Sequence, residues 1–213
     1  MSKETFQIKK WKKGFGKKYT DRNTFTADEL DKIYKDRSGV TRTTMNKVFL
    51  GNLNRDIKIL EVGSNVGNQL VILQRMGFKN LYGIELNNYA VEKAKSRTTD
   101  INIIQGSAFD IPFKDGFFDL VFTAGVLIHI SPKDIKKVLK EVHRCSKRYI
   151  WGYEFWAPKY TQKIYRGQKD LFWKTDFSKL YLHIFEDMKL IKEKHYKYLK
   201  CDDIDAMYLL KKK

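Results

Sequence analysis

The sequence has few of the residues that cross-link small extracellular folds. Only two of its 213 residues are cysteines, and Cys145 and Cys201 belong to no CxxC pair. A disulfide framework or a cysteine-ligated metal site is therefore not expected. No apolar run approaches the roughly 20 residues that a membrane-spanning helix needs. The Lys-rich N-terminus lacks the apolar core of a signal peptide, so we expect a cytoplasmic protein.

Proline is scarce as well, and its three positions mark expected ends of helices and strands. Pro112, Pro132 and Pro158 each lie where an element is expected to start or stop. Hydrophobic residues make up 42% of the chain, enough for the core of a single globular domain. The formal net charge is +17, which favours anionic partners such as nucleic acid, a nucleotide-linked sugar or a small acid. Lysines occur in every segment, so the charge also fits a generally solvated surface.

Short apolar runs alternate with amphipathic stretches through the middle of the chain. Strands are expected at 57–62, 81–84, 101–104, 118–123 and 149–152, with helices at 68–76, 90–97 and 132–145. This alternation predicts right-handed βαβ units and a mostly parallel sheet. Residues of about 26–51 are expected to be helical, from a capping box at Thr26 and Glu29. A helix at 176–185 precedes two β-like stretches, 189–196 and 205–210, which are expected to pair antiparallel.

The first strand runs directly into a glycine turn, Glu61-Val62-Gly63-Ser64-Asn65-Val66-Gly67. Gly63 permits a tight turn and a close approach of the backbone to a ligand. The amides of the following helix start attract a negative group. The G-x-x-x-G spacing differs from the G-x-G-x-x-G of dinucleotide folds and suits the methionine end of S-adenosylmethionine. The alternative is an ordinary strand-to-helix turn.

Two further elements follow at the ends of the next strands. Glu85, which precedes Leu86, lies 22 residues after Gly63, where an acid can accept hydrogen bonds from both ribose hydroxyls. Its alternative role is a helix-start carboxylate. Ser107 and the amide of Ala108 follow the third strand, where they are expected to contact the adenine edge.

The fourth strand leads into Thr123-Ala124-Gly125-Val126-Leu127-Ile128-His129. This loop, including Gly125, is expected to face the sulfonium of the cofactor. His129 titrates near neutral pH and is the candidate general base for a hydroxyl acceptor. Alternatively, it caps the helix start at Ser131 and Pro132 or only packs.

In order and spacing these four elements resemble the motifs of class I S-adenosylmethionine-dependent methyltransferases over residues 57–154. The resemblance implies a Rossmann-like α/β fold: a mostly parallel seven-stranded sheet with an antiparallel C-terminal edge strand and helices on both faces. Five segments also resemble the pseudaminic acid biosynthesis-associated methylase family: WKKGFGKKYTDRN at 11–23, YIWGYEF at 149–155, IYRG at 164–167, LFWKTDF at 171–177 and DDID at 202–205. That resemblance implies a small methyltransferase associated with nonulosonic acid or other surface-sugar pathways.

We expect one domain over 1–213. It divides into an N-terminal helical lid and substrate segment (1–50), a cofactor-binding core (57–154), and a substrate insertion with C-terminal strands (155–213). The expected substrate contacts share polar or aromatic side chains near the ligand edge of the sheet. They are Tyr19, Arg22, Asn23, Tyr153, Glu154, Tyr165 and Arg166. Arginine offers a planar fork for a carboxylate or phosphate, although Arg22 and Arg166 equally suit surface ion pairs.

The predicted reaction is methyl transfer from S-adenosylmethionine to O or N of a small, anionic acceptor such as a nucleotide-linked or nonulosonic-type sugar. Two rivals stay open, an RNA methyltransferase and a non-catalytic S-adenosylmethionine-binding module. The charge favours the first, but the basic residues are not visibly clustered. Neither a metal nor a membrane is expected, and the protein is predicted to be a monomer or homodimer.

Overall fold

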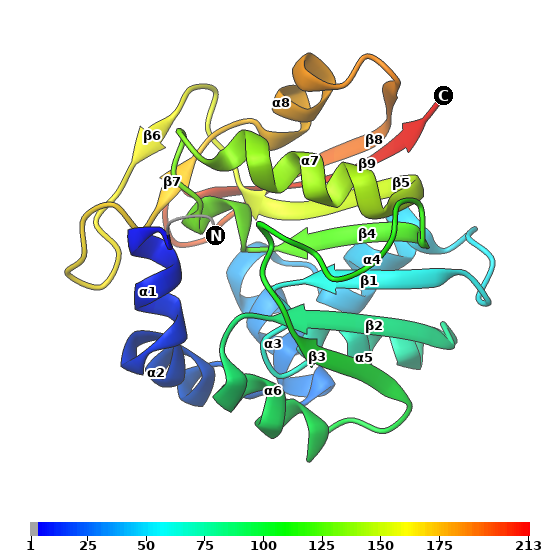
Figure 1. Ribbon diagram of the computed structural model, residues 1–213, viewed down its shortest axis with the longest axis horizontal. Helices are drawn as coiled ribbons and strands as arrows, with labels where there is room; N and C mark the ends of the chain where they lie inside the picture. Colours follow the sequence, from blue (N-terminus) through cyan, green and yellow to red (C-terminus); the bar gives the residue numbers. More distant parts are fainter. Residues whose placement is uncertain (1–3) are drawn as a thin grey trace.

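The computed structural model describes residues 4–213 and contains one seven-stranded sheet with helices on both faces (Figure 1). Its order is β3-β2-β1-β4-β5-β9-β8. The bounds are β1 Lys58–Val62, β2 Asn80–Glu85, β3 Ile101–Gln105, β4 Phe118–Ala124, β5 Ser146–Phe155, β8 Met188–Lys197 and β9 Ile204–Lys212. Strands β3, β2, β1, β4 and β5 are parallel, and β9 is antiparallel to both β5 and β8. The predicted fold class is confirmed.

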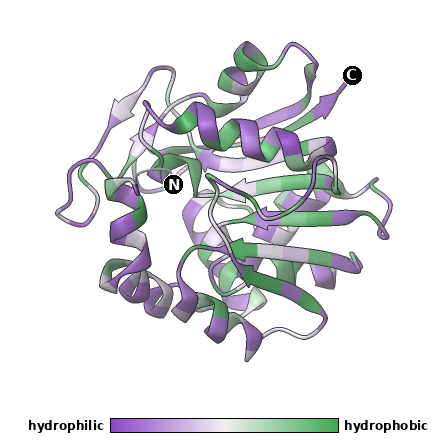
Figure 2. Ribbon diagram, in the orientation of Figure 1, coloured by the Kyte–Doolittle hydropathy of each residue, from purple (hydrophilic) through white to green (hydrophobic). Residues whose placement is uncertain are grey.

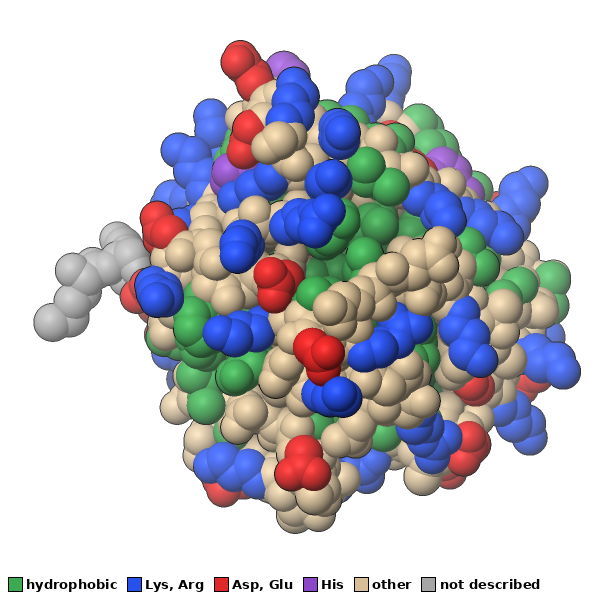
Figure 3. All heavy atoms as spheres, turned by 90° about the vertical axis from the view of Figure 1, so that its right-hand side faces the viewer, with side chains coloured by type: hydrophobic (Ala, Val, Ile, Leu, Met, Phe, Trp, Pro, Cys, Tyr) green, Lys and Arg blue, Asp and Glu red, His purple; other side chains and the backbone are tan. Residues whose placement is uncertain are grey.

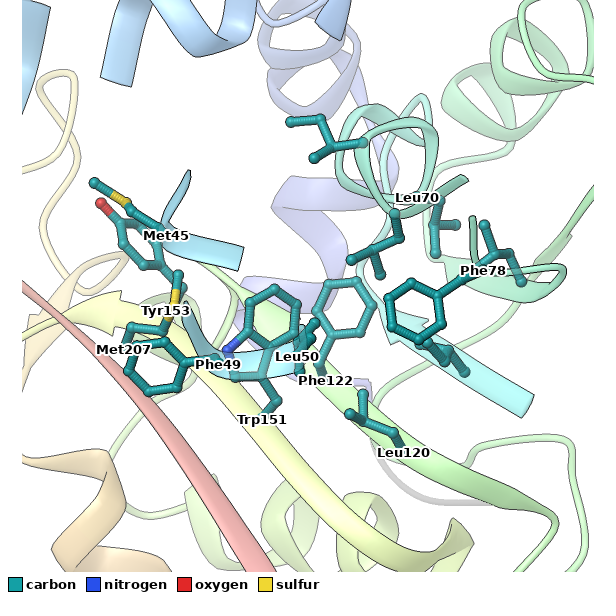
Figure 4. Close-up of a cluster of buried hydrophobic side chains, with 14 of the residues drawn as sticks. Met45, Phe49, Leu50, Leu70, Phe78, Leu120, Phe122, Trp151, Tyr153 and Met207 are labelled. Atoms are coloured by element: carbon teal, nitrogen blue, oxygen red, sulfur yellow. The ribbon is translucent and has the colours of Figure 1, made fainter. Parts of the chain in front are cut away.

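Two hydrophobic clusters, one on each face, fix the helices to the sheet. The first joins β1, β4, β5 and β9 to α3 (Ala27–Ser38), α4 (Arg42–Leu50), α5 (Asn68–Arg75) and α6 (Asn88–Lys95). Figure 4 shows part of it, with Phe49, Phe122 and Trp151 packed together. The second joins the opposite face to α7 (Ile135–Cys145) and α8 (Phe177–Ile184). Apolar residues therefore fill the central strands, whereas α7 shows one apolar and one polar side (Figure 2).

The predicted helix over about 26–51 is two helices, and the reason is local. Thr26 forms the expected capping box with Glu29. Gly39 then ends α3 in a left-handed conformation with φ of 80°, which glycine adopts without a steric penalty. Thr41 accepts a hydrogen bond from the amide of Thr44 and begins α4.

Two smaller differences concern segments near the ligand edge of the sheet. The helix expected from Pro132 begins at Ile135, because a turn in which the Ser131 hydroxyl donates to Asp134 precedes it. Two short strands, β6 (Thr161–Gln162) and β7 (Trp173–Lys174), pair with one another in the insertion. Both strands lie beyond the carboxyl ends of the parallel strands, close to α1 (Phe6–Lys12) (Figure 1). α2 (Gly14–Arg22) follows α1 along the same end.

Basic side chains are widely spread on the surface. On the face at the amino ends of the parallel strands, Lys and Arg are scattered among acidic and apolar side chains instead of forming one block (Figure 3). Within residues 4–213, no helix has the length and apolar character needed to cross a membrane.

Gly152 in β5 provides a test of the sheet register. It pairs with Tyr208 of β9, and a Cβ on Gly152 would lie 2.1 Å from Cζ of the buried tyrosine ring. We expect Gly152→Ala to lower the free energy of unfolding by about 1–3 kcal/mol, the usual cost of overpacking a core. Urea denaturation measures this. Gly14→Ala is the control, since no atom lies within 4 Å of its built Cβ. Equal stability of the two variants would contradict this packing.

Candidate functional site

One cavity of about 460 Å³ runs along the carboxyl edge of the parallel strands. Its walls come from the ends of β1, β2, β4, β5 and β9, from the loops after β3 and β4, and from α1, α2 and α3. The cavity brings together most of the site residues predicted from the sequence. These are Glu61, Gly63, Ser64, Asn65, Glu85, Leu86, Ser107, Ala108, Gly125, His129, Tyr19, Asn23, Tyr153, Tyr165 and Arg166.

The glycine turn after β1 is closed against β2. Gly63 has φ of 76°, and its amide donates to the carbonyl of Ile84 at 2.8 Å. A Cβ on Gly63 would lie 2.6 Å from Cγ2 of Val126, which leaves no room for a side chain. Asn65 is itself left-handed, with φ of 47°, a conformation that asparagine tolerates better than most residues. The turn therefore exposes backbone to the cavity at a fixed position.

The carboxylate of Glu85 ties this turn to the start of α6. Its Oε2 accepts from the amide of Asn65 at 2.9 Å, and its Oε1 accepts from the amide of Asn87 at 2.8 Å. Burial raises the pKa of Glu85, and these backbone hydrogen bonds oppose that rise. Each carboxylate oxygen keeps a further lone pair. The residue can therefore accept two hydroxyl donors, as a ribose requires.

Gly67, expected to let the helix start pack near the strand and to help hold the cofactor, does not line the cavity. It precedes α5 in a left-handed conformation with φ of 80°. A Cβ there would lie 2.9 Å from Cδ1 of Ile103. The absence of a side chain lets α5 start close to β3, so Gly67 positions the turn.

The loops after β3 and β4 complete the end of the cavity expected for the cofactor. The hydroxyl of Ser107 accepts from the amide of Phe109 at 3.2 Å, and Ser107, Ala108 and Phe109 all line the cavity. Gly125 has φ of 69° and no atom within 4 Å of a built Cβ. We call this region the cofactor end, and it comprises Gly63 to Asn65, Glu85 to Asn87, Gly106 to Phe109, and Gly125.

Glu61 is a buried acid beneath the turn. It is 2% exposed, and its Oε2 has no hydrogen-bond partner within residues 4–213. Burial raises the pKa of Glu61 well above its ordinary value, while the charge of Arg42 opposes this shift. Arg42 is fully buried and stacks over the Tyr153 ring at 4.1 Å. Arg42 could not be predicted to be buried, because its position in a helix resembles that of any surface arginine.

His129 lies in a short 3-10 helix, Leu127–His129, within an aromatic group. Its ring is 4.7 Å from that of Trp11 and 5.1 Å from that of Tyr165. Its Nδ1 lies 2.6 Å from the carbonyl oxygen of Leu171, and since a carbonyl only accepts, Nδ1 must carry the proton. Burial lowers the pKa of His129 to about 4. The residue is therefore neutral at pH 7, with Nε2 left as a proton acceptor, and it does not cap the helix after Ser131.

Two of the expected substrate contacts lie outside the cavity. Arg22 is exposed at the end of α2, and Glu154 is fully buried. Oε1 of Glu154 accepts from the amide of Val126 at 3.1 Å, so this carboxyl positions the loop after β4. Burial raises the pKa of Glu154 to about 7 against the opposing hydrogen bonds from Thr123 and from nearby backbone amides.

The helices α1 and α2 close over the cofactor end through hydrogen bonds that sequence reasoning missed. The Thr20 hydroxyl donates to Oδ1 of Asn65 at 2.8 Å, and Nδ2 of Asn87 donates to the carbonyl of Trp11 at 2.9 Å. Nδ2 of Asn68 donates to the carbonyl of Asn23 at 2.8 Å. Each bond joins residues at least 45 positions apart, so no local pattern could reveal it.

The far end of the cavity also contains residues that were not predicted. We call it the acceptor end, and it comprises Trp11, Tyr19, Tyr34, Arg37, His129, Tyr153, Phe155, Tyr165, Arg166, Phe172 and Asp205. One signal for Asp205 was available. It begins the strand expected to run antiparallel at the end of the sheet, so it lies at the edge where the parallel strands finish.

The titration of Glu154 gives a stability prediction. Folded Glu154 keeps its proton up to about pH 7, whereas the ordinary pKa is 4.5. Between these values the folded state binds more protons, so the free energy of unfolding falls as the pH rises. Glu154→Gln removes this loss, and its stability relative to wild type should grow by about 3 kcal/mol from pH 4.5 to pH 8.

Urea denaturation at both pH values measures the effect. Glu141→Gln is the control with opposite sign, because the hydrogen bond from Arg144 lowers the pKa of Glu141 and the carboxylate stabilises the fold at high pH. A pH-independent difference between Glu154→Gln and wild type would contradict the assignment.

Known proteins match this chain mainly over the core of the sheet. Residues 60–149 match the family described as a methyltransferase domain. An uncharacterized methyltransferase from Synechocystis is 31% identical over 42% of this chain and 42% of its own length. The phosphoethanolamine N-methyltransferase of Plasmodium falciparum is 25% identical over 62% of this chain and 53% of its own length. The chain thus spans about half the length of these two relatives.

The fold of this chain also resembles those of solved structures. A didemethyltoxoflavin N1-methyltransferase from Burkholderia thailandensis, solved with S-adenosylhomocysteine, superposes with a TM-score of 0.64 at 14% identity and covers 80% of this chain and 76% of its own. The comparisons support the predicted enzyme class and the predicted cofactor, S-adenosylmethionine. The chain therefore has a Rossmann-like fold, and its residues 60–149 are similar to methyltransferase domains.

Proposed function

We propose that the protein transfers a methyl group from S-adenosylmethionine to O or N of a small, anionic acceptor, such as a nucleotide-linked or nonulosonic-type sugar. One observation carries this proposal. A single cavity joins the cofactor end to an acceptor end that holds a neutral histidine with a free Nε2. The pseudaminic acid-associated methylases fit such a substrate, and the resemblance of the N-terminal and C-terminal segments to that family supports the choice.

The residues of the cofactor end suit each part of the nucleoside. Glu85 has acceptor capacity for the ribose hydroxyls, and Ser107 with the Ala108 amide suits the adenine edge. The turn at Gly63 leaves open backbone along the cavity where the methionine end is expected, and the free oxygen of Glu61 suits its ammonium. When bound, the cofactor supplies a methyl group on a sulfonium, which an electron pair of the acceptor displaces.

The acceptor end orients the nucleophile and receives its proton. Trp11, Tyr165 and Phe172 surround His129 and keep water from the reacting groups. Because the carbonyl of Leu171 fixes the proton on Nδ1, Nε2 can take the proton of an attacking hydroxyl. An uncharged amine needs orientation alone, so the requirement for His129 separates the two kinds of acceptor.

RNA methylation remains the second candidate because of the net charge of +17. On the face shown in Figure 3, at the amino ends of the parallel strands, Lys and Arg form no single nucleic-acid track. The name of the Plasmodium relative refers to a small phosphorylated acceptor, which favours a small molecule here. A non-catalytic module that binds the cofactor is the third possibility.

Cofactor binding is the first test. We expect S-adenosylhomocysteine to bind with measurable heat and NAD to give none. Glu85→Ala should weaken S-adenosylhomocysteine at least about tenfold, since hydrogen bonds to a charged group contribute about 1.5–3 kcal/mol each. Glu92→Ala, an exposed position on α6, is the control. Wild-type protein without affinity for this nucleoside, or full affinity in folded Glu85→Ala, would refute the proposal.

Catalysis is the second test. A cellular extract is incubated with the enzyme and methyl-labelled cofactor, and products are identified by mass spectrometry. We expect label in a small acid. For a hydroxyl acceptor, His129→Gln should slow transfer by on the order of 10²–10⁴-fold and leave S-adenosylhomocysteine affinity within about twofold. His143→Gln, whose ring bonds Asp187 outside the cavity, is the control. Label in RNA alone would overturn the small-molecule proposal.

A further inference from the structure

The acceptor end contains a charged pair whose hydrogen bonds are incomplete. Arg37 from α3 and Asp205 from the start of β9 both line the cavity, and their nearest charged atoms, Nη1 and Oδ2, are 3.9 Å apart. This separation is too long for a hydrogen bond. Within residues 4–213, the guanidinium of Arg37 has no closer acidic partner.

Asp205 is a buried hydrogen-bond acceptor. It is 1% exposed, and its Oδ2 accepts from the hydroxyl of Tyr153 at 2.5 Å. Its Oδ1 is also buried and has no partner among the described residues. A buried carboxylate oxygen without a donor costs free energy, and Asp205 lines the cavity. A hydrogen-bond donor on a ligand would relieve this cost.

Arg37 is held in place by aromatic rings and is still partly open. Its guanidinium lies 5.0 Å from the centre of the Tyr34 ring and 5.2 Å from that of Tyr198. Its side chain is 33% exposed. The Arg37 carbonyl also accepts from the amide of Leu199, which joins α3 to the connection between β8 and β9. A fixed, planar donor of this kind suits a carboxylate or phosphate.

Arg37 and Asp205 lie far from Glu85, the residue expected to bind the ribose of the cofactor. Asp205 on β9 lies four strands from Glu85 on β2, or roughly 19 Å at about 4.8 Å per strand. Tyr153 on the neighbouring β5 faces α4 in the cluster of Figure 4. A group bound between Arg37 and Asp205 therefore belongs to the acceptor and not to the adenosine.

We propose that Arg37 and Asp205 form a recognition subsite for the acceptor, which holds an anionic oxygen on Arg37 and an adjacent hydroxyl or ammonium donor on Oδ1 of Asp205. This inference rests on the proposed methyltransferase function and narrows its substrate class. The acceptor carries a carboxylate or phosphate beside a hydrogen-bond donor, as a hydroxy acid or an amino-alkyl phosphate does. Both residues select the substrate without taking part in proton transfer.

Anion binding can be tested without turnover. Protein saturated with S-adenosylhomocysteine is titrated with inorganic phosphate and, separately, with acetate, and binding is followed by chemical shifts in NMR spectra. Arg37→Gln should weaken the preferred anion at least about tenfold. Asp205→Asn should strengthen it, because this change removes a competing negative charge. Arg148→Gln, exposed at the opposite edge of the sheet, should leave binding unchanged.

The opposite effects of Arg37→Gln and Asp205→Asn on anion binding distinguish recognition from a merely structural role. A folded Arg37→Gln that binds both anions like wild type, or wild-type protein that binds neither, would overturn the subsite. So would a large loss of S-adenosylhomocysteine affinity in Arg37→Gln, since Arg37 would then hold the methionine carboxylate. If Arg37→Gln does not fold, Arg37→Lys replaces it. We expect this variant to bind anions more weakly, because lysine lacks the planar guanidinium with its paired donors.

Methyl transfer provides a second test of the subsite. A small-molecule extract is divided by anion exchange, and each pool receives the labelled cofactor. We expect label in the anionic pool, reduced at least about tenfold by Arg37→Gln and unchanged by Arg148→Gln. Label in the neutral pool alone would overturn the subsite but leave the methyltransferase proposal intact. Absence of any transfer with intact phosphate or acetate binding would instead refute the proposed function and retain the subsite.

Discussion

The geometry of the site depends on one carboxylate that joins two strand ends. Glu85 accepts the amides of Asn65 and Asn87, so the turn after β1 and the start of α6 are fixed relative to each other. Both amides belong to backbone that would otherwise need water or a ligand to satisfy it. The pKa of Glu85 is still raised by burial, which means that the bridge leaves part of the cost of burying this acid uncompensated. Ribose hydroxyls are well suited to reduce that cost.

The same two asparagines also hold the N-terminal helices. The side chain of Asn65 accepts from Thr20, and the side chain of Asn87 donates to the carbonyl of Trp11. The backbone of each asparagine thus serves the cofactor end while its side chain fixes the cover above it. Trp11 in turn contacts His129. A continuous series of contacts therefore leads from Glu85 through Asn87 and Trp11 to the ring proposed as the base.

The strands and the cofactor end could be predicted because their determinants are local. Gly63 and Glu85 follow apolar runs at a spacing that places them at one edge of a parallel sheet, and both were found where expected. The close approach of Gly67 to Ile103 of β3 was less accessible to prediction, since it comes from packing between segments that are distant in the sequence. Arg37 and Asp205 could not be paired from the sequence. They are 168 residues apart, and they meet only because β9 inserts beside β5 and the connection before it packs against α3.

The net charge of the chain is a poor guide to what the cavity recognises. Most of the +17 charge comes from lysines, and they are spread over surfaces such as the one in Figure 3. Inside the site the charges are nearly balanced, with Arg37 near Asp205 and Arg42 acting on Glu61. Surface charge is screened within about 10 Å at ordinary ionic strength, whereas buried charges are screened much less. The proposed selectivity therefore rests on two buried acceptors without partners, at Glu61 and Asp205, and on the partly exposed, stacked guanidinium of Arg37.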